Sequence, residues 1–213
     1  MGEESQSDYD AIVFDIDGTL WNASAASATG WTNGLRSLGV ERRITAEEIE
    51  SVAGRPYEEC VDIILPGLRR RFPALSARLG ESEREAVLAK AGVLYDGVRE
   101  GIRTLSRAHR IFIVSNCQSW YLAIFLRFSG IGPALAGCDC NGDSGLPKDK
   151  MLRNLKAAYR FQKPVYVGDT EGDGKAAASA GFPFIHVRYG FGTASEYLRA
   201  FDTFGDLVRY LDA

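Results

Sequence analysis

Short apolar runs are the feature of this sequence that most restricts its fold. Four of them stand out, at residues 11–14, 111–114, 165–167 and 184–187, and a weaker fifth spans residues 134–140. Continuous apolar runs of this length are typical of strands that are buried on both faces, as in a parallel sheet. We therefore expect a sheet in the interior of the molecule with these runs as its strands.

Segments with helical periodicity separate these runs. They cover residues 98–108, 119–128, 150–159 and 174–180. Strands that alternate with helices form βαβ units, in which the strands are parallel and the helices cover both faces of the sheet. The sequence therefore predicts an α/β fold with a parallel sheet.

The stretch between the first two strand candidates departs from this alternation. It contains amphipathic segments at residues 25–38, 46–52, 57–65 and 81–94 and no clear strand. Thr45 and Glu48 have the spacing of a capping box at the start of the second segment. The stretch is longer than a normal crossover, so we predict an all-helical domain at residues 21–95. It would be inserted into a core domain formed by residues 8–20 and 96–213.

Composition and charge argue against several classes of protein. The net charge is −3, from 25 basic and 28 acidic residues, whereas nucleic-acid-binding and membrane-surface proteins usually carry a basic excess. No apolar stretch approaches the roughly 20 residues of a membrane helix, and residues 1–10 are polar and acidic, unlike a secretory signal. The four cysteines are too few for a disulfide scaffold. We expect a cytoplasmic protein with free thiols, and neither a nucleic acid nor a membrane as its partner.

Two aspartates come directly after the first strand candidate. They are Asp15 and Asp17, and Gly18 follows them. A carboxylate at the end of a buried strand is costly unless it binds something. In open α/β sheets ligands bind at the carboxyl ends of the strands, and a glycine lets backbone amides approach an anion closely. These residues are therefore candidates for catalysis, with a turn cap by Asp17 as the alternative.

Two more aspartates follow the third strand candidate. Asp169 and Asp173 come after residues 165–167, and by the same argument they lie at the same edge of the sheet as Asp15. Mg²⁺ prefers oxygen ligands, usually one or two carboxylates together with water and substrate phosphate. The sequence therefore predicts a magnesium site that uses Asp15, Asp169 and Asp173.

Groups suited to holding a phosphate occur at two further places. Ser115 and Asn116 end the second strand candidate and offer a hydroxyl and an amide, although such a pair also opens many loops. Lys148 and Lys150 stand at the start of the third helical segment, and either could neutralise the carboxylates and the phosphate. We favour Lys148, because it lies in the Pro-Lys loop while Lys150 is expected to begin the helix and point outward.

Taken in order, these residues resemble the four motifs of the haloacid dehalogenase (HAD) superfamily. The motifs are Asp15-x-Asp17-Gly18-Thr19, Ser115-Asn116, Lys148 and Gly168-Asp169-x₃-Asp173. The resemblance spans about residues 10–187, and the helical stretch after the first motif resembles the type-one cap of this superfamily. Residues 165–192 resemble the branch that contains phosphoglycolate phosphatases and β-phosphoglucomutases. The resemblance implies a Rossmann-like HAD core with an inserted helical cap domain.

The same resemblance implies roles for the first two aspartates. Asp15 would be the nucleophile that forms an aspartyl-phosphate, and Asp17 would be the general acid and base. A carboxylate nucleophile splits one difficult displacement into two easier steps. Dehalogenases that resemble this family lack an acid at the position of Asp17, because a halide leaves without a proton. An acid there favours phosphate esters over carbon–halogen bonds as substrates.

The resemblance also implies which residues hold the phosphate and the metal. The phosphate-binding candidates are Asp17, Gly18, Ser115, Asn116 and Lys148, of which Ser115 and Lys148 also count as catalytic. The Mg²⁺ ligands would be Asp15, Asp169, Asp173 and, through its main-chain carbonyl, Asp17. Metal and lysine would together stabilise charge on the transferring phosphoryl group.

The predicted cap offers candidates for substrate recognition. Arg55 lies in a loop that resembles the substrate-specificity loop of this cap type, and we predict that it contacts an anionic part of the substrate. A plain surface arginine is the alternative. Trp21, Trp31 and Trp120 could line a pocket, but aromatic residues at such spacing are interpreted as core residues.

Three functions are compatible with these motifs. The favoured one is Mg²⁺-dependent hydrolysis of a small phosphomonoester, of the phosphoglycolate or sugar-phosphate type, by a monomer or small homo-oligomer. The second is a phosphomutase of the β-phosphoglucomutase type, which passes the phosphoryl group to a sugar instead of water. The third is a non-catalytic phosphate-binding protein, which is disfavoured because all the charged catalytic groups are present.

Overall fold

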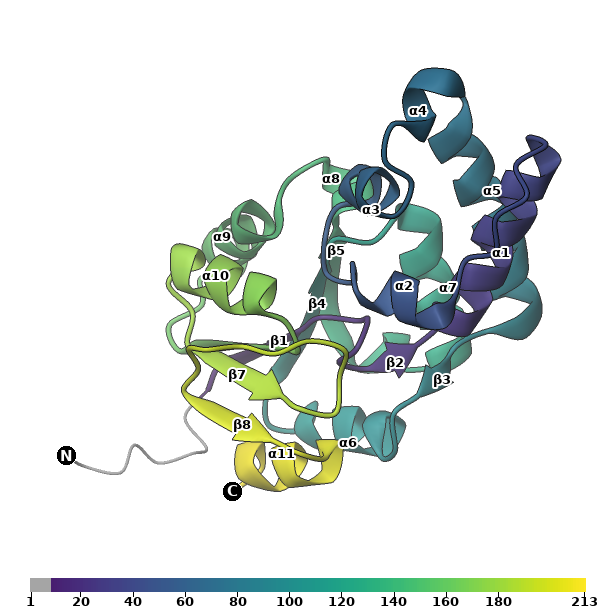
Figure 1. Cartoon of the computed structure of the whole chain (residues 1–213). Coiled ribbons are helices and arrows are strands. Elements are labelled where there is room, and N and C mark those ends of the chain that lie inside the picture. The colour runs from purple at the N-terminus through teal and green to yellow at the C-terminus, as the bar shows by residue number, and fades with distance from the viewer. Residues whose placement is uncertain (1–8) are drawn as a thin grey trace.

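The structure, a computed structural model, describes residues 9–213 and has a six-stranded parallel sheet at its centre (Figure 1). The order of the strands is β5-β4-β1-β6-β7-β8. They are β1 (Ala11–Phe14), β4 (Arg110–Ser115), β5 (Leu135–Cys140), β6 (Pro164–Gly168), β7 (Phe184–Val187) and β8 (Arg199–Phe201). Residues 1–8, which include the start of the predicted core domain and most of the polar N-terminal segment, lie outside the described residues.

The sheet confirms the predicted α/β fold. The strands β1 and β7 have the predicted bounds, and β4, β5 and β6 differ from the predicted runs by one residue at one or both ends. The strand β8 is not among the predicted strands, because this short edge strand, with an exposed Arg199, gives no apolar run.

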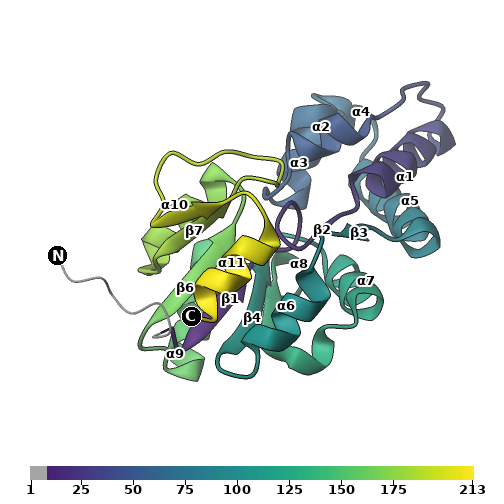
Figure 2. The same ribbon diagram turned by 90° about the horizontal axis from the view of Figure 1, so that it is seen from below.

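Each face of the sheet has its own hydrophobic core, because alternate residues of a strand point to opposite faces. Ile12 and Phe14 belong to a cluster with the helices α6 (Val98–Leu105), α7 (Ser119–Ser129) and α11 (Phe204–Leu211). Ala11 and Val13 belong to a second cluster with α9 (Lys148–Tyr159) and α10 (Glu171–Ala180). Figure 2 shows α6 and α11 side by side on one face of the sheet.

The position of β1 brings the ends of three strands together. Phe14 is in register with Ile113 of β4 on one side and with Val167 of β6 on the other. The main-chain N–H of Asp15 donates a hydrogen bond to the carbonyl of Val167 at 2.9 Å, which extends this pairing by one residue. The residues that follow these strands therefore meet at one edge of the sheet, as expected for the ligand edge of an open α/β fold.

A helical insertion, residues 24–90, lies beside this edge (Figure 1). Its helices are α1 (Ser24–Ser37), α2 (Ala46–Glu50), α3 (Tyr57–Ile64), α4 (Leu68–Arg71) and α5 (Leu75–Lys90). It has a hydrophobic cluster of its own, which includes Trp31, Leu35 and Leu79. The first three helices lie within two residues of the predicted segments, and Thr45 and Glu48 form the predicted capping box.

Two predictions for this region are wrong. The helix α5 spans Leu75–Lys90 rather than residues 81–94, and it ends because Ala91 adopts a φ of +57°. The stretch also contains strands, since β2 (Trp21–Asn22) and β3 (Val93–Leu94) form a two-stranded antiparallel ribbon where the chain enters and leaves the insertion. Strands of two residues are too short to show a sequence period.

The helices α1 and α5 approach each other closely because α1 carries glycines on the contact side. A Cβ atom on Gly30 would lie 2.3 Å from the Cα of Glu83, and one on Gly34 would lie 3.1 Å from the Leu79 side chain.

Two shorter elements complete the fold, α8 (Asn141–Ser144) and a 3₁₀ turn at Gly132–Ala134. Within residues 9–213 no helix combines the length and the apolar character needed to cross a membrane.

Candidate active site

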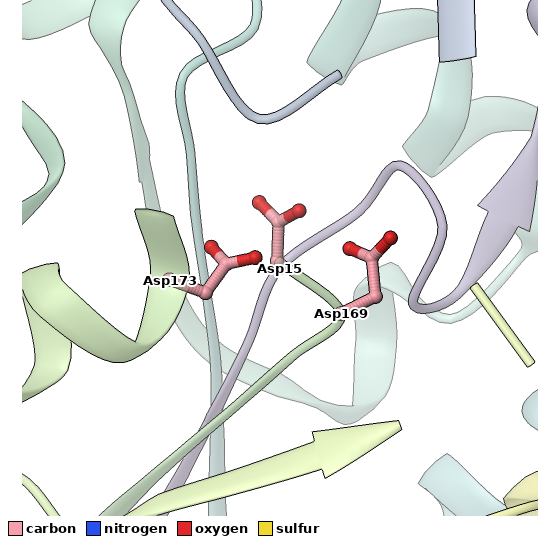
Figure 3. Close-up of side chains that lie close together, drawn as sticks. All are labelled: Asp15, Asp169 and Asp173. Atoms are coloured by element: carbon pink, nitrogen blue, oxygen red, sulfur yellow. The ribbon is translucent and has the colours of Figure 1, made fainter. Parts of the chain in front are cut away.

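Three buried carboxylates converge at the carboxyl edge of the sheet (Figure 3). Asp15 follows β1, Asp169 follows β6, and Asp173 lies in the first turn of α10. One carboxylate oxygen from each lies within 4.8 Å of the others. The structure thus brings together the three aspartates that the sequence analysis assigned to a magnesium site.

Lys148 is the cation of this cluster. Its Nζ donates hydrogen bonds to Oδ1 of Asp15 at 2.8 Å and to Oδ1 of Asp173 at 2.5 Å, and its side chain is 4% exposed. Lys150 is exposed. The choice of Lys148 over Lys150 agrees with this geometry, but the reason given for it is wrong, because Lys148 itself is the first residue of α9.

The cluster contains three carboxylates and one lysine, so it carries an excess of negative charge. Burial raises the pKa of Asp15 to about 6 although Lys148 lowers it, and burial together with Asp173 raises the pKa of Asp169 well above its usual value. Burial also acts on Asp173, but Lys148 and Thr170 outweigh it and lower the pKa of that carboxyl. The Oδ2 atom of Asp15 is buried without a hydrogen-bond partner. A hard divalent cation with oxygen ligands fits this donor set.

Asp169 is held in place by the loop after β7. The main-chain N–H groups of Phe191 and Gly192 donate to its Oδ2 at 2.8 and 3.3 Å, and the Thr19 hydroxyl donates to its Oδ1 at 3.4 Å. Gly18 has a φ of +75°, and a Cβ atom there would lie 2.2 Å from Oδ2 of Asp169. The absence of a side chain at Gly18 therefore makes room for the Asp169 carboxylate.

Asp17 lies apart from the three-carboxylate cluster and faces a cavity between the sheet edge and the helical insertion. The Tyr121 hydroxyl donates a hydrogen bond to Oδ1 of Asp17, and Nε1 of Trp21 donates to that hydroxyl at 3.2 Å. Burial raises the pKa of Asp17 to about 7, while the bond from Tyr121 acts in the opposite direction. Tyr121 is not among the predicted site residues, because an aromatic residue on a helix is usually part of the core.

Ser115 and Asn116 also lie at this edge, and Asn116 connects it to the insertion. Ser115 ends β4 and is 3% exposed. The Asn116 side-chain N–H donates to the main-chain carbonyl of Gly54 at 2.8 Å. A Cβ atom on Gly54, whose φ is +80°, would lie 3.2 Å from the Thr170 hydroxyl. The loop between α2 and α3 therefore rests directly on the edge that carries the carboxylates.

The cavity is shared by the core and the insertion. The core contributes Asp17, Ser115, Asn116, Cys117, Gln118, Trp120, Tyr121 and Phe191 to its lining. The insertion contributes Ser24, Ser27, Trp31, Ile49, Val52, Ala53, Gly54, Arg55, Tyr57, Cys60 and Glu83. Arg55 is exposed. Trp31 and Trp120 line the cavity, although tryptophans at this spacing are expected in the core. Trp21 is buried in the core, as expected.

Glu83 is the member of this lining that the sequence analysis missed and could have found. On α5 it lies between Leu79 and Val87 at the i+4 spacing of the buried stripe. The apolar face of an amphipathic helix packs against the core and normally carries no charged residue. A glutamate on that face therefore indicates, from the sequence alone, a buried carboxylate that is a candidate for a functional role.

The fold, together with the carboxylates at the edge of the sheet, indicates the family of hydrolases to which this protein belongs. Residues 12–187 match the haloacid dehalogenase-like hydrolase family, and the chain belongs to that family. It is similar to a phosphoglycolate phosphatase from Nitrosospira multiformis, with 32% identity over 200 residues that cover 85% of this chain and 84% of the relative. The family predicted from the motifs is thereby confirmed, and the predicted enzyme class, a phosphatase, agrees with the name of this relative.

Solved structures share the fold at lower sequence identity. A predicted phosphoglycolate phosphatase from Haemophilus somnus superposes with a TM-score of 0.84 at 20% identity, covering 97% of this chain and 99% of the other. A haloacid dehalogenase-like family protein from Streptococcus pneumoniae gives a TM-score of 0.79 at 19% identity, covering 95% and 98% of the two chains. The helical insertion is therefore part of the architecture that these proteins have in common.

Proposed function

We propose that this chain is a Mg²⁺-dependent phosphatase that hydrolyses a small phosphomonoester through an aspartyl-phosphate on Asp15. The observation that carries the proposal is the environment of Asp15. Its Oδ1 is oriented by Lys148 at 2.8 Å, while its Oδ2 is buried without a partner. One carboxylate is thus held in a fixed orientation at the edge where ligands of such sheets bind.

The proposed metal ligands are the carboxylates of Asp15, Asp169 and Asp173 and the main-chain carbonyl of Asp17. Three buried carboxylates with a single lysine supply the charge and the oxygen atoms that Mg²⁺ prefers. When bound, the metal would neutralise charge on the phosphate and act as a Lewis acid. Asp173 is also tied to Thr170, whose hydroxyl donates to its Oδ2 at 2.6 Å, so its orientation is set from both sides.

In the proposed first step Asp15 attacks phosphorus and the alcohol leaves. Lys148 keeps the Asp15 carboxylate oriented and contributes positive charge to the phosphoryl oxygens, where phosphoryl transfer mainly needs help. The Ser115 hydroxyl and the main-chain N–H groups near Gly18 and Asn116 are the proposed donors to the same oxygens. Because these groups belong to strand ends and a tight turn, they hold the phosphate with little reorganisation.

Asp17 is the proposed general acid and base. Because the pKa of Asp17 is about 7, a large fraction of the protein molecules carries a protonated Asp17 near neutral pH. The protonated form donates to the oxygen of the departing alcohol, and the resulting carboxylate then takes a proton from the water that attacks the aspartyl-phosphate. The hydroxyl of Tyr121 holds Asp17 toward the cavity throughout.

The helical insertion is the proposed cap domain, residues 21–95, on a core of residues 8–20 and 96–213. It supplies more than half of the cavity lining, so it is placed to contact the leaving group. Candidate substrates are phosphoglycolate, as the name of the Nitrosospira relative suggests, and sugar phosphates. Contact of Arg55 with an anionic part of the substrate, a cytoplasmic location and a monomer or small homo-oligomer stay predictions.

Phosphate release from a panel of esters, measured with Mg²⁺ and again with EDTA, tests this proposal. The panel contains 2-phosphoglycolate, hexose phosphates, nucleotides and p-nitrophenyl phosphate. We expect release that requires Mg²⁺ and is restored when Mg²⁺ is added after EDTA. Release that is insensitive to EDTA would contradict the metal-dependent mechanism.

The phosphomutase alternative predicts a different outcome of the same assay. It needs a bisphosphate activator and interconverts sugar phosphates while releasing phosphate slowly. The non-catalytic alternative predicts phosphate binding with no release from any ester.

A further inference from the structure

A buried carboxylate, Glu83, lines the cavity on the side of the helical insertion. Glu83 lies on α5 at the point where Gly30 of α1 lets the two helices approach, and it is 7% exposed. Nε1 of Trp31 donates a hydrogen bond to its Oε2 at 2.7 Å. Short bonds of this kind are typical of an ionised acceptor.

The partners of Glu83 are neutral. Within residues 9–213 it forms no salt bridge, and Arg55 is the single lysine or arginine in the cavity lining. Burial raises the pKa of Glu83, while its contacts with the side chains of Ser27, Trp31 and Tyr57 act in the opposite direction. A buried carboxylate without a cation is costly, so a ligand that donates hydrogen bonds to it gains affinity.

Tyr57 adds a second polar group beside Glu83. Its buried hydroxyl lies next to the Glu83 carboxylate, but the contact does not have the geometry of a hydrogen bond. It lies close enough to Glu83 that burial, followed by the charge of that carboxylate, raises its pKa. A polar leaving group in the cavity would therefore find both an acceptor and a hydroxyl whose bonding capacity is unused.

The same cavity contains Asp17, the proposed acid for the leaving oxygen. Asp17 lines this cavity from the sheet edge, and Glu83 lines it from α5 of the insertion. A leaving group with a carboxylate of its own would meet two acidic groups there. A leaving group with hydroxyl or ammonium donors would find an acceptor in Glu83.

We propose that Glu83 selects phosphomonoesters whose leaving alcohol donates hydrogen bonds, a polyol, a sugar or an amino alcohol, and disfavours leaving groups that carry a carboxylate. The inference rests on the proposed phosphatase function and narrows its substrate class. Sites built around a buried hydrogen-bonding group discriminate strongly against ligands that leave that group unpaired. The wild-type enzyme should therefore prefer donor-bearing esters to 2-phosphoglycolate.

The test compares Glu83→Gln with Glu85→Gln, which removes an exposed charge two residues away on the same helix. Both variants and the wild type are assayed with glycerol 3-phosphate, glucose 6-phosphate, phosphoethanolamine, 2-phosphoglycolate and p-nitrophenyl phosphate. We expect Glu83→Gln to lower kcat/KM by roughly 10- to 100-fold on the preferred donor-bearing ester, the range expected for a hydrogen bond to a charged group. On 2-phosphoglycolate the value should stay the same or rise, and Glu85→Gln should behave as wild type.

Activity on p-nitrophenyl phosphate, whose leaving group has no hydrogen-bond donor, distinguishes a failure of the phosphatase proposal from a failure of the Glu83 proposal. No release by the wild type from p-nitrophenyl phosphate or any other ester contradicts the phosphatase proposal itself. If the wild type is active but prefers 2-phosphoglycolate, the role of Glu83 is overturned. The same holds if Glu83→Gln retains activity on p-nitrophenyl phosphate and changes kcat/KM by the same factor on all esters. The wild-type ranking needs no variant, so the inference can be contradicted even if Glu83→Gln does not fold. The amino alcohol and the polyols distinguish an ammonium donor from hydroxyl donors.

Discussion

The sheet edge and the helical insertion each bury carboxylates, but they compensate them differently. At the sheet edge Asp15 and Asp173 share Lys148, and Asp169 receives two main-chain N–H groups. In the insertion Glu83 has only neutral donors. The sheet edge is therefore organised before any substrate arrives, whereas the group in the insertion is left with bonding capacity for a ligand.

In the proposed function this difference assigns chemistry and selection to separate parts of the molecule. The positioned charges at the sheet edge would act on the phosphoryl group, which all phosphomonoesters share. The cavity lining from the insertion would contact the alcohol, in which esters differ. Variants at the sheet edge should therefore slow all substrates, and variants in the insertion should change the ranking of substrates.

The largest effect is expected for Asp15→Asn. An amide is a poor nucleophile and a poorer Mg²⁺ ligand, so turnover should fall by at least about 10⁴-fold, as when other nucleophiles are removed. The loss should be the same on every ester of the panel. Phosphate release under saturating substrate measures it, with thermal unfolding as the control for folding. Activity equal to wild type would contradict the covalent mechanism.

Asp17→Asn is expected to have the next largest effect, because it removes the proposed acid and base. Losses of about 10²–10⁴-fold are typical for such groups. The first step should suffer less on p-nitrophenyl phosphate, whose leaving group needs no proton, and burst kinetics can measure that step. If Asp17→Asn slows both steps equally on all esters, this would argue against an acid role.

Tyr121→Phe keeps the ring and removes the hydroxyl that holds Asp17. It should lower turnover less than Asp17→Asn.

Gly30→Ala tests the packing that places Glu83. In an exposed helix alanine is more stable than glycine by up to about 1 kcal/mol, but here the new Cβ would lie 2.3 Å from the Cα of Glu83. Overpacking of this kind typically costs about 1–3 kcal/mol, so the free energy of unfolding should decrease. Gly80→Ala on α5 is the matched control, because its Cβ would have no contact closer than 3.6 Å. Chemical denaturation of both variants measures the difference, and equal stabilisation would show that α1 and α5 are less tightly packed.

The smallest effect is expected for Asn116→Ala, which removes the bond between the sheet edge and the Gly54 carbonyl. A neutral hydrogen bond contributes about 1 kcal/mol, which corresponds to a change of several-fold in an equilibrium constant. KM should rise by this factor on all esters, with their ranking unchanged. A change in ranking would mean that Asn116 contacts the leaving group.

The parts of this molecule that follow from local sequence patterns were predictable. The apolar runs located five of the six strands, and the three aspartates and Lys148 could be grouped because parallel strands end at one edge. The remainder depends on contacts between segments distant in sequence. The ribbon of β2 and β3 is too short to show a period, and Tyr121 reaches Asp17 across 104 residues. The proximity of Glu83 to α1 depends on Gly30, which a periodicity analysis of either helix alone does not reveal.

The stereochemical course at phosphorus tests the covalent mechanism most directly. A phosphorothioate ester that is chiral at phosphorus through its sulfur and two different oxygen isotopes would be hydrolysed by the wild-type enzyme with Mg²⁺ in water labelled with the third oxygen isotope, and the configuration of the chiral inorganic thiophosphate determined. Attack by Asp15 followed by attack of water involves two in-line displacements, each of which inverts phosphorus. The account therefore predicts net retention of configuration. Net inversion would mean a single direct attack by water and would contradict the role of Asp15 as nucleophile.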